Sequence, residues 1–154
     1  MPMNSTNFLE PASVIVFKKL DEKGGNLFLL EKPLRTIAIV YSAQGVIDNG
    51  GLEYFFESDF PDNPPYQMFV DAYSEIGAIE EAEIIENSLS FFSLPKPELD
   101  MEGRRQFLAS LPSDYSHEFS KLSEKLCGNE KIWLLLEEYA KKNKSLICIA
   151  DDSQ

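Results

Sequence analysis

The sequence contains one histidine, His117, and two cysteines, Cys127 and Cys148, among its 154 residues. A catalytic histidine needs partner side chains in fixed positions, and no nucleophile motif stands near His117. We therefore expect His117 at the surface or capping a helix. The cysteines lack the spacing of a metal or redox motif, so we expect free buried thiols, although a bridge between them stays open. Neither residue type points to an enzyme.

Long apolar runs, phosphate-binding glycine loops and leader signals are also missing. No apolar stretch approaches the roughly 18 residues that indicate a membrane-spanning helix. Gly24-Gly25 and Gly50-Gly51 have neither the spacing nor the lysine of a phosphate-binding loop. The first ten residues carry no basic flank and no apolar core, which is untypical of a signal peptide. We expect a cytoplasmic protein that needs no cofactor and binds no membrane.

Basic residues are scarce in the middle of the chain. The sequence carries 26 acidic and 14 basic residues, for a net charge of −12 at pH 7. Residues 36–103 hold 14 of the acids and one base, Lys96, so this segment has a charge of −13 and the remainder +1. Such a segment either keeps the surface solvated or binds something strongly positive. We expect no direct binding of nucleic acid.

Apolar residues recur at helical spacing through most of the chain, which predicts an all-α protein. We expect a flexible tail over residues 1–10 and a single domain over residues 11–150, built from seven or eight short to medium helices. The expected helices cover residues 13–20, 33–48, 52–58, 66–76, 79–92, 101–110, 113–126 and 130–143. The first could also be a strand, because it is rich in β-branched residues. Residues 146–149 form either an edge strand or a packed tail.

Two of these helices carry local signals. Ser113 is expected to cap the helix over residues 113–126. In the last helix, Glu137 and Lys141 lie one turn apart, as do Glu138 and Lys142, so both are expected to pair.

The strongest break in the sequence is Asn49-Gly50-Gly51, because asparagine and glycine tolerate left-handed backbone angles. Neither flank alternates as a β-hairpin would, so we expect a corner between two helices. Phe55 and Phe56 should then enter the core together.

This segment resembles the signature of a bacterial domain family typified by an acidic DNA-mimic protein. The family pattern is Glu-Val-x-Asn-Gly-Gly-Phe-x-Gln-aromatic-aromatic. Residues 46–56 follow it with Ile47 and Leu52 at the Val and Phe positions, whereas Val46 and Tyr54 replace the Glu and the Gln. Weaker similarity extends over about residues 34–142. The resemblance implies a non-enzymatic protein whose acidic helical face binds and modulates a basic DNA-binding protein.

The acids of the middle segment are the candidate partner-binding residues. Side chains one helical turn apart start about 5–6 Å from each other, which is not far from the spacing of successive phosphates. The middle helices place no base beside their acids. Glu81 falls toward the apolar face of its helix and is expected in the first turn, where the helix dipole favours an acid. The candidates, which we expect to be exposed, are Glu53, Glu57, Asp71, Glu75, Glu80, Glu83 and Glu86.

Two other functions remain open. One is an immunity or antitoxin protein that neutralises a basic nuclease toxin. The other is an enzyme or metal-binding protein with a site near the corner, at Asp48, Asn49 and Tyr54. Residues 59–63 offer oxygen ligands for calcium, but their prolines and the missing distal ligand favour an ordinary turn. A monomer and a homodimer are both compatible with the sequence.

Overall fold

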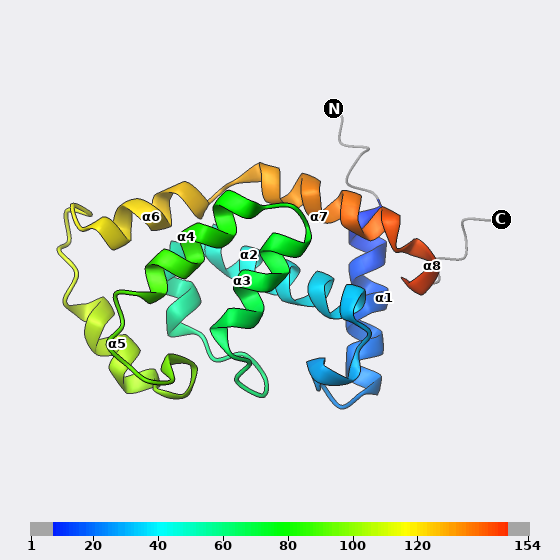
Figure 1. Ribbon diagram of the computed structural model, residues 1–154, viewed down its shortest axis with the longest axis horizontal. Coiled ribbons are helices and arrows are strands. Elements are labelled where there is room, and N and C mark those ends of the chain that lie inside the picture. The colour runs from blue at the N-terminus through cyan, green and yellow to red at the C-terminus, as the bar shows by residue number, and fades with distance from the viewer. Residues whose placement is uncertain (1–7, 148–154) are drawn as a thin grey trace.

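The longest helix, α2 (Lys32–Glu57), runs through the middle of the molecule, and the other helices are arranged around it (Figure 1). It packs against α1, α3, α5, α6, α7 and α8. Residues 36–40 are all buried, as expected for a helix that is enclosed on every side. Pro33 lies in its first turn, where the fixed φ of proline suits the start of a helix.

The computed structural model describes residues 8–147, and all regular structure in that range is helical. Besides α2, the elements are α1 (Leu9–Glu22), the 3-10 helix η2 (Leu27–Leu29), α3 (Tyr66–Glu75), α4 (Ile79–Leu89), the 3-10 helix η3 (Pro97–Leu99), α5 (Met101–Ala109), α6 (Glu118–Leu126), α7 (Glu130–Lys142) and α8 (Lys144–Ile147). The prediction of one all-α domain is confirmed. None of the helices described is both long enough and apolar enough to cross a membrane.

An aromatic cluster fills the core at the C-terminal end of α2. Phe55 and Phe56 are fully buried, as predicted, with their ring centroids 4.9 Å apart. Phe55 packs on Phe69 of α3 at 5.1 Å, and Phe56 packs on Phe92 at 4.8 Å. Phe92 in turn contacts Phe107 of α5 at 4.9 Å. These rings join the end of α2 to the helices on both sides of it.

Both ends of the described range differ from the predictions in detail. α1 begins at Leu9, so the expected tail boundary at residue 10 falls inside a helix. Residues 13–20 belong to this helix, and the strand alternative was wrong. At the other end, Leu146 and Ile147 lie in α8 rather than in an edge strand. The remaining two residues of that predicted segment, 148 and 149, lie outside the described range.

The prediction that Ser113 caps a helix starting at residue 113 was wrong. Tyr115 has a left-handed φ of 62°, which interrupts helical geometry, and α6 begins only at Glu118. His117 is the cap: its Nδ1 accepts a hydrogen bond of 3.0 Å from the Phe119 N–H. The imidazole also packs edge-on against Phe91, with centroids 5.3 Å apart.

We expect His117→Ala to lower the free energy of unfolding by about 1–2 kcal/mol, because it removes both the cap and a ring contact. Ser113→Ala is the matched control and should change stability by less than about 0.5 kcal/mol, since Ser113 is exposed. Urea denaturation followed by circular dichroism measures both. A larger loss for Ser113→Ala would contradict this assignment of the cap.

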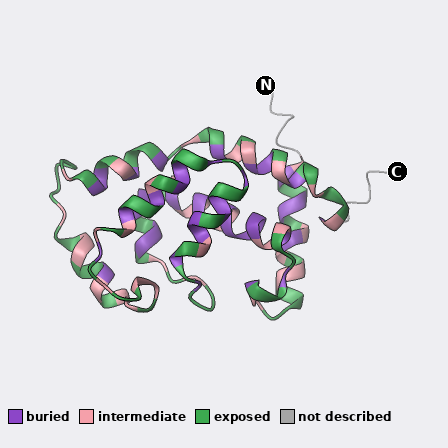
Figure 2. Cartoon of the chain, viewed as in Figure 1, coloured by how far each residue is buried: buried purple, intermediate pink, exposed green. Residues whose placement is uncertain are grey.

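Two further expectations, the burial of Cys127 and the ion pairs within α7, were wrong. Cys127 is a free thiol, as expected, but it is exposed rather than buried, and Cys148 lies outside the described residues. Glu137 is only 5% exposed, and it forms no ion pair with Lys141 or with any other described residue. The exposed Glu138 likewise forms no ion pair with described residues. Buried and exposed residues alternate along the helices, as Figure 2 shows.

Candidate functional site

The Asn-Gly-Gly corner is a kink inside α2. Gly50 and Gly51 leave helical angles while the residues on both sides remain helical. Gly51 has φ 74° and ψ −170°, a combination that is essentially restricted to glycine. The kink turns the Leu52 N–H toward α6, where it donates to Ser123 Oγ at 2.8 Å. Ser123 in turn donates to Glu53 Oε1 at 2.8 Å, so the corner is attached to α6 through one hydroxyl.

Asp48, just before the corner, joins α2 to the junction of α6 and α7. Its Oδ1 accepts from Gln44 Nε2 and from the Gly128 N–H, both at 2.8 Å. Its Oδ2 accepts from Trp133 Nε1 at 2.8 Å. Both carboxylate oxygens are therefore occupied by donors of the scaffold, whereas Asn49 and Tyr54, the other candidates for a site here, are exposed. This geometry favours a structural role for Asp48.

Gln44 extends this network into the core. The fully buried Gln44 donates to the Leu126 carbonyl at 2.9 Å and accepts from the Tyr73 hydroxyl at 2.8 Å. Burial raises the pKa of Tyr73 well above its usual value, and the charges of Asp48 and Glu81 raise it further. Tyr73 therefore stays a neutral hydrogen-bond donor, and the network ties α3 to the kinked helix.

Arg104, which the sequence did not single out for any role, caps the C-terminal end of α2. Its side chain is completely buried, and its Nε donates to the Phe56 carbonyl at 2.6 Å. Its Nη1 donates to the Pro97 carbonyl at 2.6 Å, and its Nη2 pairs with Asp59 Oδ1 at 3.0 Å. The last carbonyls of a helix lack partners within the helix, and Arg104 supplies one.

The stretch considered for calcium is thus partly used by the scaffold. Asp59 is the partner of Arg104, while Asp62 and Asn63 form a turn with φ values of 65° and 44°. Within the described range, no group of three or more His, Cys, Asp or Glu residues is placed to hold a metal ion.

The α3–α4 hairpin brings most of the candidate acids together. These two helices pack against each other, and they lie in front of α2 in Figure 1. The other candidates lie on α2: Glu53 is half-buried at the corner, which corrects the expectation that it is exposed, and Glu57 is exposed near the end of the helix. The exposed acids of the hairpin are Asp71 and Glu75 on α3, and Glu80, Glu83 and Glu86 on α4.

A family model described as DMP19-like protein matches residues 29–143, which is well over half of the chain. The chain belongs to the DMP19-like family. The matched region contains the corner, Arg104 and the whole α3–α4 hairpin, whereas α1 and α8 lie outside it. No curated protein and no solved structure matches the chain. The family assignment inferred from the sequence is confirmed, and the match of the Asn-Gly-Gly segment to a family signature stays a prediction.

Bases from outside the acidic segment neutralise part of this DMP19-like hairpin. Lys32 pairs with Glu75 at 3.3 Å, and Lys131 of α7 lies 3.3 Å from Glu81 and 3.9 Å from Glu80. Neither α3 nor α4 carries a base of its own, as the sequence indicates, and the bases that pair with these acids come from distant parts of the sequence. Glu81 is buried in the first turn of α4, as predicted.

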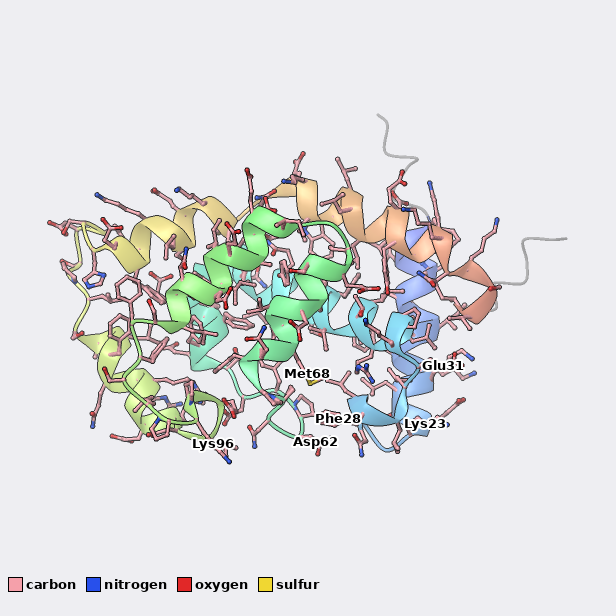
Figure 3. The ribbon with its side chains drawn as sticks, in the orientation of Figure 1. Lys23, Phe28, Glu31, Asp62, Met68 and Lys96 are labelled. Carbon is pink, nitrogen blue, oxygen red and sulfur yellow. The ribbon has the colours of Figure 1, made fainter. Side chains whose placement is uncertain are left out.

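The remaining acids of the hairpin are Asp71, Glu83 and Glu86, and we term these three together the open acidic surface. Asp71 lines a cavity with Lys32 and Arg35 of α2, whereas Glu83 and Glu86 lie on α4. All three are exposed, and none forms an ion pair with any residue in the described range. Lys96, the one base of the acidic segment, lies in the loop beside α5, apart from α3 and α4 (Figure 3). The neutralised acids lie at the turn between α3 and α4, so the uncompensated charge lies farther along the hairpin.

Proposed function

We propose that this DMP19-like protein is a non-enzymatic DNA mimic that binds a basic DNA-binding protein in the cytoplasm. The observation that carries the proposal is the open acidic surface. Asp71, Glu83 and Glu86 form no ion pair with described residues, although Lys32 and Lys131 pair with neighbouring acids of the hairpin.

The spacing of these acids supports an interaction with phosphate-binding side chains. Glu83 and Glu86 are three residues apart on α4, so their side chains leave the same side of the helix about 5–6 Å apart. A DNA-binding protein presents lysines and arginines at positions that match backbone phosphates. Carboxylates on two adjacent helices can occupy several of those positions at once.

The hairpin presents its carboxylates on a rigid support. Phe69 and Tyr73 of α3 and Ile85 of α4 are buried beneath the surface, and Tyr73 is hydrogen-bonded to Gln44 of α2. A rigid surface loses little conformational entropy on binding, so more of the electrostatic attraction remains as affinity. The net charge of −12 also steers a basic partner toward the protein, and salt weakens this effect.

Reversing the open acidic surface tests the proposal. The triple variant Asp71→Lys, Glu83→Lys, Glu86→Lys should bind the partner about 30-fold more weakly, because each change replaces attraction by repulsion at the interface. The partner is isolated with the tagged wild-type protein from the native host at low salt. Double-stranded DNA and high salt should each displace it.

The control is a triple reversal with the same change in net charge, made at exposed positions of α1 and α7: Asp21→Lys, Glu22→Lys, Glu138→Lys. Glu137 is left unchanged because it is buried. The control should retain binding within about threefold, since distant charges are largely screened at physiological salt. Equal losses in both variants would show that only net charge matters, and failure of DNA to compete would contradict DNA mimicry.

A further inference from the structure

A cavity of about 230 Å³ opens beside the corner, apart from the open acidic surface. Residues of the corner, of α6 and of the loop before α6 line it. They include Gly51, Glu53, Tyr115, Ser123, Glu124 and Cys127. The cavity thus has two carboxylates, two serine hydroxyl groups, a thiol and an aromatic ring, but no basic side chain lines it.

The scaffold orients one of the carboxylates. Ser123 is buried, accepts from the Leu52 N–H and donates to Glu53 Oε1, both at 2.8 Å. Glu53 therefore keeps a fixed position while its charge stays uncompensated: neither Glu53 nor Glu124 forms an ion pair with residues between 8 and 147. A cation that enters the cavity meets a negative charge held in place.

The aromatic side chain is unusual in its exposure and backbone. Tyr115 is 71% exposed and has a left-handed φ of 62°, which is uncommon for a large side chain. Its ring makes no contact with another aromatic ring among the described residues. The face of such a ring attracts cations, and arginine in particular.

We propose that this cavity binds an arginine side chain of the basic partner, an inference that rests on the proposed function. A guanidinium group has five donors in one plane, stacks on aromatic rings and is less strongly hydrated than an ammonium group. Glu53 and Glu124 accept its hydrogen bonds, and Tyr115 packs against its face. The cavity thus provides a specific anchor, while the open acidic surface supplies the general attraction.

Nuclear magnetic resonance of the full-length ¹⁵N-labelled protein tests this directly. The probe is the capped tripeptide Gly-Arg-Gly, with Gly-citrulline-Gly as its neutral isostere and Gly-Lys-Gly as a cation without the planar fork. The arginine peptide should shift the amide signals of Gly50, Gly51 and Ser123 at millimolar concentrations. The lysine peptide should bind more weakly, and the citrulline peptide should cause no shift.

Replacing glutamate by glutamine removes the charge but keeps the shape of the side chain, and so measures what the charges of Glu53 and Glu124 contribute to binding. Glu124→Gln should weaken arginine binding about threefold, and Glu53→Gln with Glu124→Gln about tenfold, since exposed ion pairs are modest individually. The glutamine at position 53 keeps an oxygen for the Ser123 hydroxyl, so the corner remains intact. The matched control, Glu22→Gln with Glu138→Gln at exposed positions of α1 and α7, should leave binding unchanged.

Equal binding of the arginine and citrulline peptides would overturn the inference, as would shifts confined to the open acidic surface. If the peptide does not bind in the cavity while the wild-type protein still captures a partner that DNA displaces, the arginine anchor is wrong and the proposed function stands. Peptide binding in the cavity without any such partner would leave an arginine site and contradict DNA mimicry.

Discussion

Replacing Arg104 by alanine should lower the free energy of unfolding by about 3–5 kcal/mol. The change leaves the carbonyls of Phe56 and Pro97 without their donor and opens a cavity where a fully buried side chain now lies. Unsatisfied buried carbonyls carry the full cost of desolvation. Arg104→Lys should lose about 2 kcal/mol, because an ammonium group cannot reach the separate acceptors with the geometry of a guanidinium.

Urea denaturation followed by circular dichroism measures these losses, and two controls isolate their cause. Arg105→Ala alters the exposed neighbour and should change stability by less than about 0.5 kcal/mol. Asp59→Asn removes the ion pair alone and should cost less than about 1 kcal/mol, because the side chain of Asp59 is 58% exposed. A loss from Asp59→Asn as large as that from Arg104→Ala would show that the ion pair, rather than the capping of carbonyls, stabilises this end of α2.

Gly51→Ala should destabilise the protein by about 2–4 kcal/mol. An L residue at φ 74° and ψ −170° is strained by about 1–3 kcal/mol. The added Cβ would also fall against Ser123 Oγ and lie 2.7 Å from Glu53 Oε1. The hydrogen bonds that join the corner to α6 would therefore be disturbed as well. Thermal and urea denaturation measure the effect.

Two other glycines of α2 provide controls for this substitution. Gly45→Ala should stabilise the protein by about 0.5–1 kcal/mol, because the position is helical and no atom beyond the helix backbone and its chain neighbours lies within 4 Å of the new methyl group. At Gly50, φ is −161°, so backbone strain is absent, and the atoms nearest to an added Cβ belong to the half-exposed Tyr54, whose side chain can turn into solvent by a change of rotamer. Gly50→Ala should cost less than about 1 kcal/mol. Equal effects at the two corner glycines would contradict a special role for Gly51.

Features of the fold that depend on neighbours in sequence could be predicted. The helical class, the kink at Asn49-Gly50-Gly51 and the burial of Phe55 and Phe56 follow from local periodicity and from glycine. The predictions were wrong where a residue from a distant part of the sequence contacts the element. His117 rather than Ser113 caps α6, because aromatic rings of the core hold the imidazole in place and Tyr115 breaks the preceding turn.

In the candidate site, too, features set by neighbours in sequence could be predicted, whereas features set by distant residues could not. The excess of acids over residues 36–103 is a property of the sequence, and helical spacing placed Glu81 on the inner side of α4. The donors that engage the other acids come from far along the chain, which spacing within a helix cannot show. Ser123 reaches Glu53 across 70 positions, and Trp133 reaches Asp48 across 85.

The sequence by itself therefore determined the all-α class, the charge of the middle segment and the position of the kink, because each depends on residues within a few turns of one another. Only the tertiary structure decided which charges remain uncompensated. The packing of α7 beside the start of α4 places Lys131 against Glu80 and Glu81, and the start of α2 places Lys32 against Glu75. Ion pairing depends on distances in space, so the open acidic surface exists only once these helices have packed.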